Sequence, residues 1–335
     1  MIIFKTVFRN LILVCLFFSV DLKGQSLQKD IDHDYIHLAD PTIFHHKGMY
    51  YLYGTGGSKQ TSQGFVVYTS TDLKTWQKPK GVAEGYALKK GDAFGESHFW
   101  APQVFQYKKK FYMAYTADEH IAIAVSDSPL GPFVQSVKQP LLLGNGAKQI
   151  DPFVFMDNKG AKYLYYVVVA NGANRIYVAE LKDDLSGIKE GSVRKCIEAD
   201  QPWENTWNAR WRVTEGPTVV KHKDYYYLFY SANDFRNPDY AVGYAVSKSL
   251  LGPWEKVAGN PVISRKNIGH NGTGHGDVLS DDKGQLYYVL HTHFSDEKVS
   301  PRLTGIVKVN FVKKRSGPDE FQADTSSFYY LQSGD

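Results

Sequence analysis

The sequence predicts an all-β protein, a five-bladed β-propeller of four-stranded antiparallel blades. One pattern recurs five times along the chain: an apolar strand, a polar or glycine turn, and a tyrosine-rich strand. Self-similarity at a roughly constant period, here about 50 to 65 residues, indicates a repeat architecture. No segment of the sequence shows the sustained periodicity of a helix.

Each copy of the repeat pairs a first strand with a tyrosine-rich second strand. The first strands begin near Asp40, Ala101, Asp151, Glu215 and His275, and the second strands are residues 49–53, 111–115, 163–166, 225–230 and 286–290. Alternating β-branched and aromatic residues bounded by Gly, Pro, Asn and Asp are typical of half-buried strands. Radial packing of such sheets gives a propeller, which leaves few exposed strand edges.

Three aromatic residues occupy the same place in their repeats. Trp76, Phe133 and Trp254 each follow a third strand and a turn. Because this position recurs, we expect the three rings to pack between blades rather than to contact a ligand. Trp100 differs, since it directly precedes the first strand of the second repeat.

The first residues are typical of an export signal. Lys5 and Arg9 lie beside an apolar run that ends at Val20. The run is too short for a membrane span, which needs about 20 residues. We therefore predict a signal peptide over residues 1–24, a single propeller domain over residues 25–335, and a secreted or periplasmic protein.

Cysteine content and charge argue against lipidation, an internal disulfide and a polyanionic partner. Cys15 lacks the small-residue neighbours of a lipoprotein site, so lipidation is not expected, and removal of the signal leaves Cys196 alone, without a disulfide partner. The formal net charge of +4 implies no polyanionic partner. We expect a monomer with no nucleic-acid partner and no membrane partner after signal cleavage.

Acidic residues begin three of the five first strands: Asp40, Asp151 and Glu215. In a propeller these strands line the central channel, so the three residues are expected to form part of one rim. A lone Asp-Pro is a common turn. Three converging acids, however, raise one another's pKa, and such a cluster indicates a functional site.

The order of the blades suggests different roles for the three acids. Asp151 and Glu215 belong to neighbouring blades, whereas Asp40 is expected across the channel from Glu215. Glu215 is then the candidate general acid, with a pKa raised by Asp151, and Asp40 is the candidate base that activates a water. Inverting glycosidases separate their two carboxyl groups by about 6.5 to 9.5 Å and retaining ones by about 5 to 5.5 Å, so cross-channel placement favours inversion.

The motifs around these acids resemble those of glycoside hydrolase family 43. They are Ala39-Asp40-Pro41, Phe99-Trp100-Ala101-Pro102, Ile150-Asp151-Pro152 and Thr214-Glu215-Gly216-Pro217. The resemblance extends over essentially all of the chain after the signal. It implies a five-bladed propeller in which Asp40 is the base, Asp151 tunes and orients the acid, and Glu215 is the acid.

The resemblance also implies roles for His275 and Arg302. Gly274-His275-Gly276 is similar to the family's axial histidine, which implies a structural calcium or a water at the propeller centre, although Gly276 replaces the usual polar residue. The alternative is a hydrogen-bonded structural histidine. Arg302 matches an arginine that contacts substrate hydroxyls in family β-xylosidases, the alternative being a solvated surface arginine. No cofactor is expected for the chemistry itself.

Three tryptophans are candidates for stacking on a sugar ring: Trp100, Trp211 and Trp207. Trp203, Trp207 and Trp211 belong to an insertion just before the strand of Glu215. We expect this insertion to cover the site and to select the substrate.

The sequence therefore predicts an inverting hydrolase of O-glycosyl bonds that acts on pentose-containing plant polysaccharides or oligosaccharides, an α-L-arabinofuranosidase or a β-xylosidase. An arabinanase or galactanase of the same family is an alternative. A non-catalytic carbohydrate-binding propeller would have identical pockets in every blade, but the rim residues differ between blades. A retaining invertase-like enzyme would need an Asn-Asp-Pro-Asn type motif, and the chain has Ala39-Asp40-Pro41-Thr42.

Overall fold

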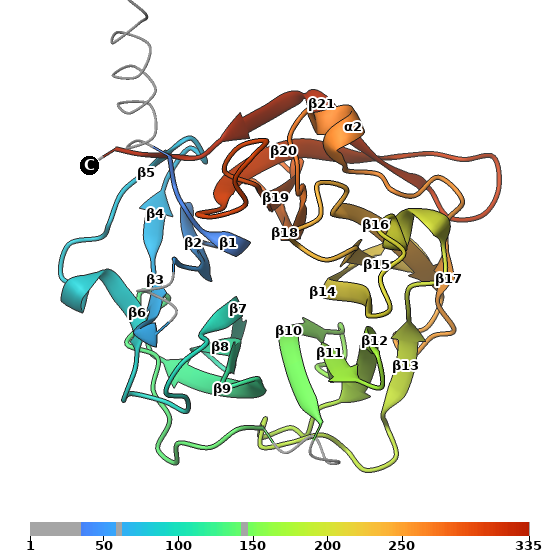
Figure 1. The fold of residues 1–335 in the computed structure, drawn as a ribbon. Helices are drawn as coiled ribbons and strands as arrows, with labels where there is room; N and C mark the ends of the chain where they lie inside the picture. The colour runs from blue at the N-terminus through green and yellow to red at the C-terminus, as the bar shows by residue number, and fades with distance from the viewer. Residues whose placement is uncertain (1–34, 58–61, 142–146, 335) are drawn as a thin grey trace, which may run out of the picture. The chain divides into compact units, whose positions relative to one another are not determined.

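The computed structural model describes residues 35–57, 62–141 and 147–334, and the predicted signal peptide and Cys15 lie outside these ranges. The described residues are almost entirely strands and loops (Figure 1). The helical segments among them are η2 (Ala83–Gly85), η3 (Pro202–Asn205) and α2 (Arg265–Ile268). None of the helices in this part of the chain is long and apolar enough to cross a membrane.

Five strands surround a central axis. They are β1 (Ala39–His46), β7 (Trp100–Tyr107), β10 (Lys148–Met156), β14 (Arg212–His222) and β18 (Gly274–Ser280). Each contacts the next in cyclic order, and β18 contacts β1. The sheets radiate outward from this ring (Figure 1), so the described residues form the five-bladed propeller that the repeat predicts.

Antiparallel partners extend each inner strand outward. The second strands are β2 (Met49–Thr55), β8 (Lys110–Ala117), β11 (Lys162–Ala170), β15 (Tyr225–Ala232) and β19 (Leu286–Thr292). The third strands are β4 (Tyr68–Ser70), β9 (His120–Ser126), β12 (Ala173–Glu180), β16 (Ala241–Ser247) and β20 (Leu303–Val312). A separate two-stranded antiparallel sheet pairs β3 (Gly64–Val66) with β6 (Tyr86–Lys89).

The outermost strand varies in length between blades. The fourth strands are β5 (Thr75–Trp76) in the first blade, β13 (Arg194–Ile197) in the third, β17 (Glu255–Lys256) in the fourth and β21 (Glu320–Tyr330) in the fifth. In the second blade a single bridge between Val125 and Val134 takes this place. Pro132 shortly before Val134 lacks the N–H that a longer ladder would use.

Buried apolar side chains fill the interfaces between adjacent blades. Trp76 lies in the cluster between the fifth and first blades, Phe133 between the first and second, and Trp254 between the third and fourth. Trp76 and Phe133 are fully buried and Trp254 is 9% exposed, which confirms their prediction as core residues. Burial of one such ring stabilises the fold by about 1.5 to 3 kcal/mol.

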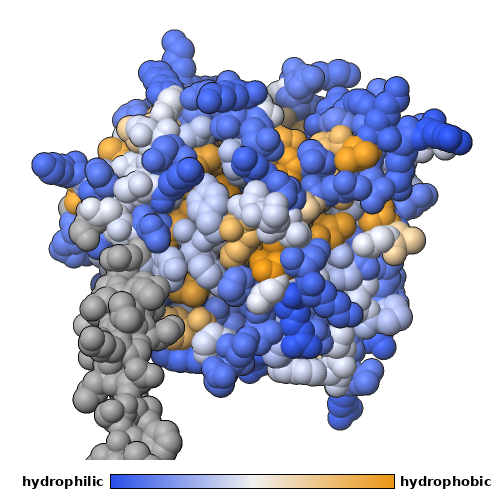
Figure 2. Space-filling model, turned by 90° about the horizontal axis from the view of Figure 1, so that it is seen from above, coloured by the Kyte–Doolittle hydropathy of each residue, from blue (hydrophilic) through white to orange (hydrophobic). Residues whose placement is uncertain are grey.

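Segments from both ends of the described chain join the first and fifth blades. Strand β22 (Gln332–Ser333) runs parallel to β5. The N–H of Ile36 donates to the carbonyl of Leu331 at 3.0 Å, and the N–H of Leu331 donates to the carbonyl of Thr304 at 2.9 Å. The side of the ring that carries β20 and β21 is mainly hydrophilic, with hydrophobic residues gathered near its middle (Figure 2).

Candidate active site

Every inner strand carries the same backbone irregularity. Its pairing with the second strand breaks register, and the bulge residue there has a φ between 40° and 59°. These bulge residues are Asp40, Ala101, Asp151, Gly216 and His275. Positive φ is strained for residues other than glycine. The shared bulge brings all five residues to a central cavity of about 30 Å³.

Glu215 is not the positional counterpart of Asp40 and Asp151. The bulge residue of the fourth blade is Gly216, and Glu215 precedes it, so its counterparts are Trp100 and Ile150. The prediction that the three acids occupy equivalent rim positions is therefore wrong by one residue. Successive side chains of a strand point in different directions. Glu215 does not line the central cavity but a second pocket, which shares Asp40, Asp151 and His275 with that cavity.

All three acidic residues nevertheless line this one pocket, which has a volume of about 490 Å³. The predicted substrate-binding residues Trp100, Trp211 and Arg302 line it as well, and so does His275. Trp207 does not belong to its lining and is 55% exposed. Residues from β1, β10 and β14, far apart in the sequence, thus meet at a single site.

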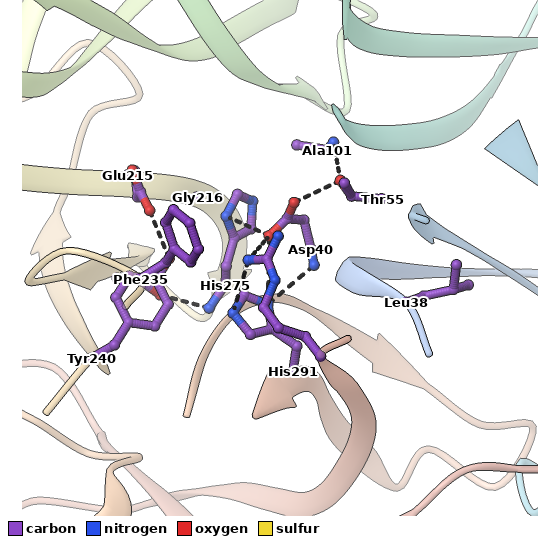
Figure 3. A network of polar contacts seen from close by, with 12 residues as sticks. Leu38, Asp40, Thr55, Ala101, Glu215, Gly216, Phe235, Tyr240, His275 and His291 are labelled. Atoms are coloured by element: carbon purple, nitrogen blue, oxygen red, sulfur yellow. Dashed lines mark hydrogen bonds and ion pairs between the residues drawn. The ribbon is translucent and has the colours of Figure 1, made fainter. Parts of the chain in front are cut away.

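Asp40 is surrounded by groups that favour its ionised form (Figure 3). Arg302 Nη1 donates to Oδ1 at 3.2 Å, and the Thr55 hydroxyl donates to Oδ2 at 2.6 Å. His275 Nδ1 lies 3.3 Å from Oδ1. Burial alone would raise the pKa of Asp40, but Arg302, His275, His291 and Thr55 together hold this pKa well below its usual range. Asp40 is therefore a carboxylate at any physiological pH.

Glu215 has the opposite electrostatics. Burial raises the pKa of Glu215 to about 7, and the negative charge of Asp40 adds to this shift. The two hydrogen bonds that Glu215 accepts act in the opposite direction. The hydroxyl of Tyr240 donates to Oε1 at 2.9 Å, and Asn174 Nδ2 donates to Oε2 at 3.2 Å. Glu215 thus holds its proton in acidic solution and begins to lose it near pH 7, which suits a general acid.

Asp151 links the third blade to the fourth. Its Oδ2 accepts a hydrogen bond from the N–H of Gly216 at 3.1 Å, and its own N–H donates to Thr116 Oγ1 at 3.0 Å. Burial and the charges of Glu215 and Asp40 raise the pKa of Asp151 well above its usual value. Its carboxyl group contacts the peptide next to Glu215, which suits a positioning role.

A chain of hydrogen bonds connects Trp211 to Glu215 through Asn174. The indole N–H of Trp211 donates to Asn174 Oδ1 at 2.9 Å, and Asn174 Nδ2 donates to Glu215 Oε2. Because an indole can only donate, it fixes the orientation of the Asn174 amide, with the NH₂ group toward Glu215. Trp211 therefore offers a half-exposed aromatic face to the pocket and also orients a partner of Glu215.

Replacing Trp211 with phenylalanine is expected to lower kcat by roughly three- to tenfold, the usual worth of one neutral hydrogen bond. Phenylalanine keeps an aromatic face but lacks the N–H that orients Asn174. Steady-state kinetics on an aryl pentoside would measure kcat and KM separately. Trp207→Phe, on the same insertion but outside the pocket lining, is the matched control. A change in KM alone for Trp211→Phe would show that the residue only contacts substrate.

The insertion that carries Trp211 is anchored by a buried carboxylate. Glu204, fully buried, accepts hydrogen bonds from the Tyr230 hydroxyl at 2.6 Å and from the N–H groups of Asp200 and Gln201 at 2.7 Å. Lys256 Nζ lies 2.7 Å from Glu204 Oε1. A buried charge that is paired and fully hydrogen-bonded fixes its segment in one position. The insertion therefore holds Trp211 at the pocket wall.

Several residues in or next to the pocket were not predicted from the sequence. Asn174 and Tyr240 contact Glu215 but lie outside the first strands, and no motif marks them. His291 accepts a hydrogen bond from the N–H of Asp40 through Nδ1 at 3.1 Å. His291 lies near the end of a tyrosine-rich second strand and pairs with the residue before the bulge, as Thr55 does, so an alignment of second strands could have found it. The ring of Phe235 lies against the guanidinium of Arg302, whose Cζ is 4.9 Å from the centre of the phenyl ring.

The calcium or water expected at the propeller centre stays a prediction. Calcium takes six to eight oxygen ligands, but no group of three or more His, Cys, Asp or Glu side chains among the described residues could hold a metal. The Asp277 oxygens at the centre already accept hydrogen bonds from Thr218 at 2.6 Å and Thr42 at 2.8 Å. His275, predicted for this role, lines the central cavity, and its Nδ1 lies 3.3 and 3.9 Å from the nearest oxygens of Asp40 and Asp151.

Comparison with known proteins agrees with this fold. Among solved structures, an endo-1,4-β-xylanase from Bacteroides thetaiotaomicron is 37% identical, with a TM-score of 0.80 over 90% of this chain and 98% of that one. A β-D-galactofuranosidase from Aspergillus niger is 24% identical over 82% of this chain and 79% of its own length. An extracellular exo-α-(1→5)-L-arabinofuranosidase from Cellvibrio japonicus is 24% identical over 76% of this chain and 78% of its own length.

The family assignment follows from a match over most of the chain. Residues 36–314 match the glycosyl hydrolases family 43, a range that begins before Asp40 and extends past Arg302. This range includes the inner strand of every blade. The chain therefore belongs to glycoside hydrolase family 43 and is an enzyme that hydrolyses O-glycosyl bonds.

Proposed function

We propose that the protein is a secreted, inverting α-L-arabinofuranosidase or β-xylosidase that acts on pentose-containing plant oligosaccharides or polysaccharides. The observation that carries the proposal is the contrast between two carboxyl groups in one pocket. The surroundings of Asp40 favour its ionised form, whereas those of Glu215 favour its protonated form. Glycoside hydrolysis needs one carboxyl group of each kind.

Each carboxyl group has a separate role in this mechanism. Glu215 donates its proton to the glycosidic oxygen while the bond to the anomeric carbon breaks. Asp40 accepts a proton from the water that attacks the anomeric carbon from the opposite side. Asp151 positions the acid through the Gly216 N–H. The inner strands β1 and β14 are not neighbours in the ring, which supports inversion because a water must fit between base and sugar.

The pocket and the relatives support a small furanose or pentose unit. Trp100 and Trp211 provide aromatic faces for a sugar ring, and Arg302 provides donors for its hydroxyls. The relatives are named for xylan, arabinofuranose and galactofuranose substrates. Export is supported by the predicted signal peptide and by relatives described as extracellular.

A substrate screen tests the proposal. Purified protein would be incubated with 4-nitrophenyl α-L-arabinofuranoside, β-D-xyloside and β-D-galactofuranoside, and nitrophenol release measured. We expect turnover of the arabinofuranoside or the xyloside. Turnover of the galactofuranoside alone would move the assignment to the function of the Aspergillus relative. No turnover of any of the three would contradict the proposed function.

Activity is expected to fall as the pH rises through about 7. The acid works only while Glu215 is protonated, and its pKa is raised to about 7, so kcat/KM should drop about tenfold for each unit above that pH. The base stays ionised far into acidic solution because the pKa of Asp40 lies well below its usual range. A profile of kcat/KM from about pH 4 to 9 would check this, and activity that increased above pH 7 would contradict it.

A further inference from the structure

A ring of hydrogen bonds joins the blades at their bulges. In each blade, one residue of the second strand pairs with the inner-strand residue that comes just before the bulge. In four blades this second-strand residue has a side-chain atom that can accept a hydrogen bond. The four residues are Thr55, Thr116, Ser231 and His291. Each accepts a hydrogen bond from the backbone N–H of the bulge residue in the next blade, at 2.8 to 3.1 Å. These contacts satisfy buried donors at points where the strand ladder is interrupted.

The third blade breaks this pattern. The corresponding residue is Val167, which pairs with Ile150 and has no polar side-chain atom. Val167 is fully buried in the apolar cluster between the third and fourth blades. In the other blades a residue at this position accepts a hydrogen bond from the bulge N–H of the next blade. Here that N–H belongs to Gly216, and it donates to Asp151 Oδ2 at 3.1 Å.

The two aspartates at equivalent bulges are therefore held differently. Asp40 Oδ2 accepts a hydrogen bond from Thr55, in its own blade, at 2.6 Å. Asp151 has Val167 in the place of Thr55, and this residue offers it no hydroxyl. The carboxyl group of Asp151 reaches into the fourth blade, to the peptide that follows Glu215.

The bond to Gly216 holds a segment of backbone that would otherwise be loosely fixed. Gly216 has a φ of +59°, and a Cβ at this position would lie 2.8 Å from the ring of His275, so only glycine fits. Glycine is also the residue with the greatest backbone freedom. An acceptor at its N–H therefore restrains the peptide that carries Glu215.

We propose that Val167 is a positioning residue for the general acid. Because Val167 lacks the hydroxyl that Thr55 has in the first blade, the Gly216 N–H and the Asp151 carboxyl group have no such partner and bond to each other. Val167 touches no substrate and acts through Asp151. The effect on catalysis rests on the proposed role of Glu215, whereas the hydrogen bonds can be tested without it.

Val167→Thr is the variant that tests this idea, because it changes little besides one hydroxyl. A buried hydroxyl needs hydrogen-bond partners. It is expected to accept from the Gly216 N–H and to donate to Asp151, as Thr55 does between Ala101 and Asp40. Asp151 would then be held within its own blade, and its bond to the peptide after Glu215 would be lost.

The expected kinetic result is a kcat about tenfold lower, with KM unchanged. The loss should be larger for aryl glycosides with poor leaving groups, since these depend most on the acid. The pair Val167→Ser and Val167→Ala is the matched control, because both variants leave a cavity but only serine introduces a hydroxyl. Serine occupies the equivalent position in the fourth blade, Ser231. Val167→Ser should share the defect, and Val167→Ala should keep the wild-type ratio between poor and good leaving groups. Equal ratios in all four proteins would overturn the proposal.

A crystal structure of Val167→Thr distinguishes this inference from the proposed function. We expect the Gly216 N–H to donate to the introduced hydroxyl, with Asp151 Oδ2 moved beyond hydrogen-bond distance. Asp151 still bonded to Gly216 would overturn the inference even in a fully active enzyme. Absence of turnover by the wild-type protein would count against the proposed function alone, because the hydrogen bonds are read from the structure.

Discussion

Replacing Glu215 with glutamine is expected to lower kcat by roughly a thousandfold on an aryl pentoside with a poor leaving group. Glutamine keeps the size of the side chain but has no acidic proton to transfer, and general acid catalysis contributes about 10²- to 10⁴-fold. The loss should be much smaller for a dinitrophenyl pentoside, whose leaving group departs without protonation. Comparison of kcat for phenyl and dinitrophenyl substrates measures this difference.

Glu119→Gln is the matched control for this variant. Glu119 pairs with Lys148 at 2.5 Å and does not line the pocket, so kcat should equal that of the wild type. If Glu215→Gln lost the same factor with both leaving groups, Glu215 would not be the proton donor, and the carboxyl group would have some other role in the pocket.

Replacing Asp40 with asparagine is expected to lower kcat by about 10³- to 10⁴-fold with either leaving group, at the upper end of the range for acid and base catalysis. Asparagine keeps the size of the side chain and one acceptor oxygen, enough for the hydrogen bond of either Arg302 or Thr55. It cannot take a proton from water. The charge of Asp40 also raises the pKa of Glu215. Removing that charge should move the decline of the residual activity to lower pH.

Asp127→Asn is the control for the base, since Asp127 is an exposed residue paired with Lys110. It should leave both kcat and the pH profile unchanged. Thermal unfolding of Asp40→Asn would show that the variant is folded. A folded Asp40→Asn protein that kept more than about a tenth of the wild-type kcat would exclude Asp40 as the base.

The sequence was informative about the fold because the fold is a repeat. Five copies of one strand pattern predict five blades, and the recurring place of Trp76, Phe133 and Trp254 predicts their packing between blades. The pattern was less informative at the outer edge. There a single bridge at Val134 replaces a strand, because edge strands have few partners to specify their length.

The site was predictable only where chemistry and repeat position coincide. Asp40 and Asp151 stand at the bulges, so the repeat placed them together. Glu215 was found as an acid but assigned to the wrong register. The signal for the right register was present, since a proline follows Asp40, Ala101 and Asp151 directly but follows Gly216, not Glu215, in the fourth repeat. Asn174 and Tyr240 reach Glu215 through tertiary contacts alone, which no local pattern encodes.

The first-formed sugar tests the account most directly, because the separate tasks of Asp40 and Glu215 predict one stereochemical outcome. Proton NMR would follow the anomeric signals of the released pentose before mutarotation. An anomer of opposite configuration to the substrate is predicted, as required if Asp40 activates a water. An anomer of the same configuration would contradict the account, because Asp40 would then have to attack the sugar itself.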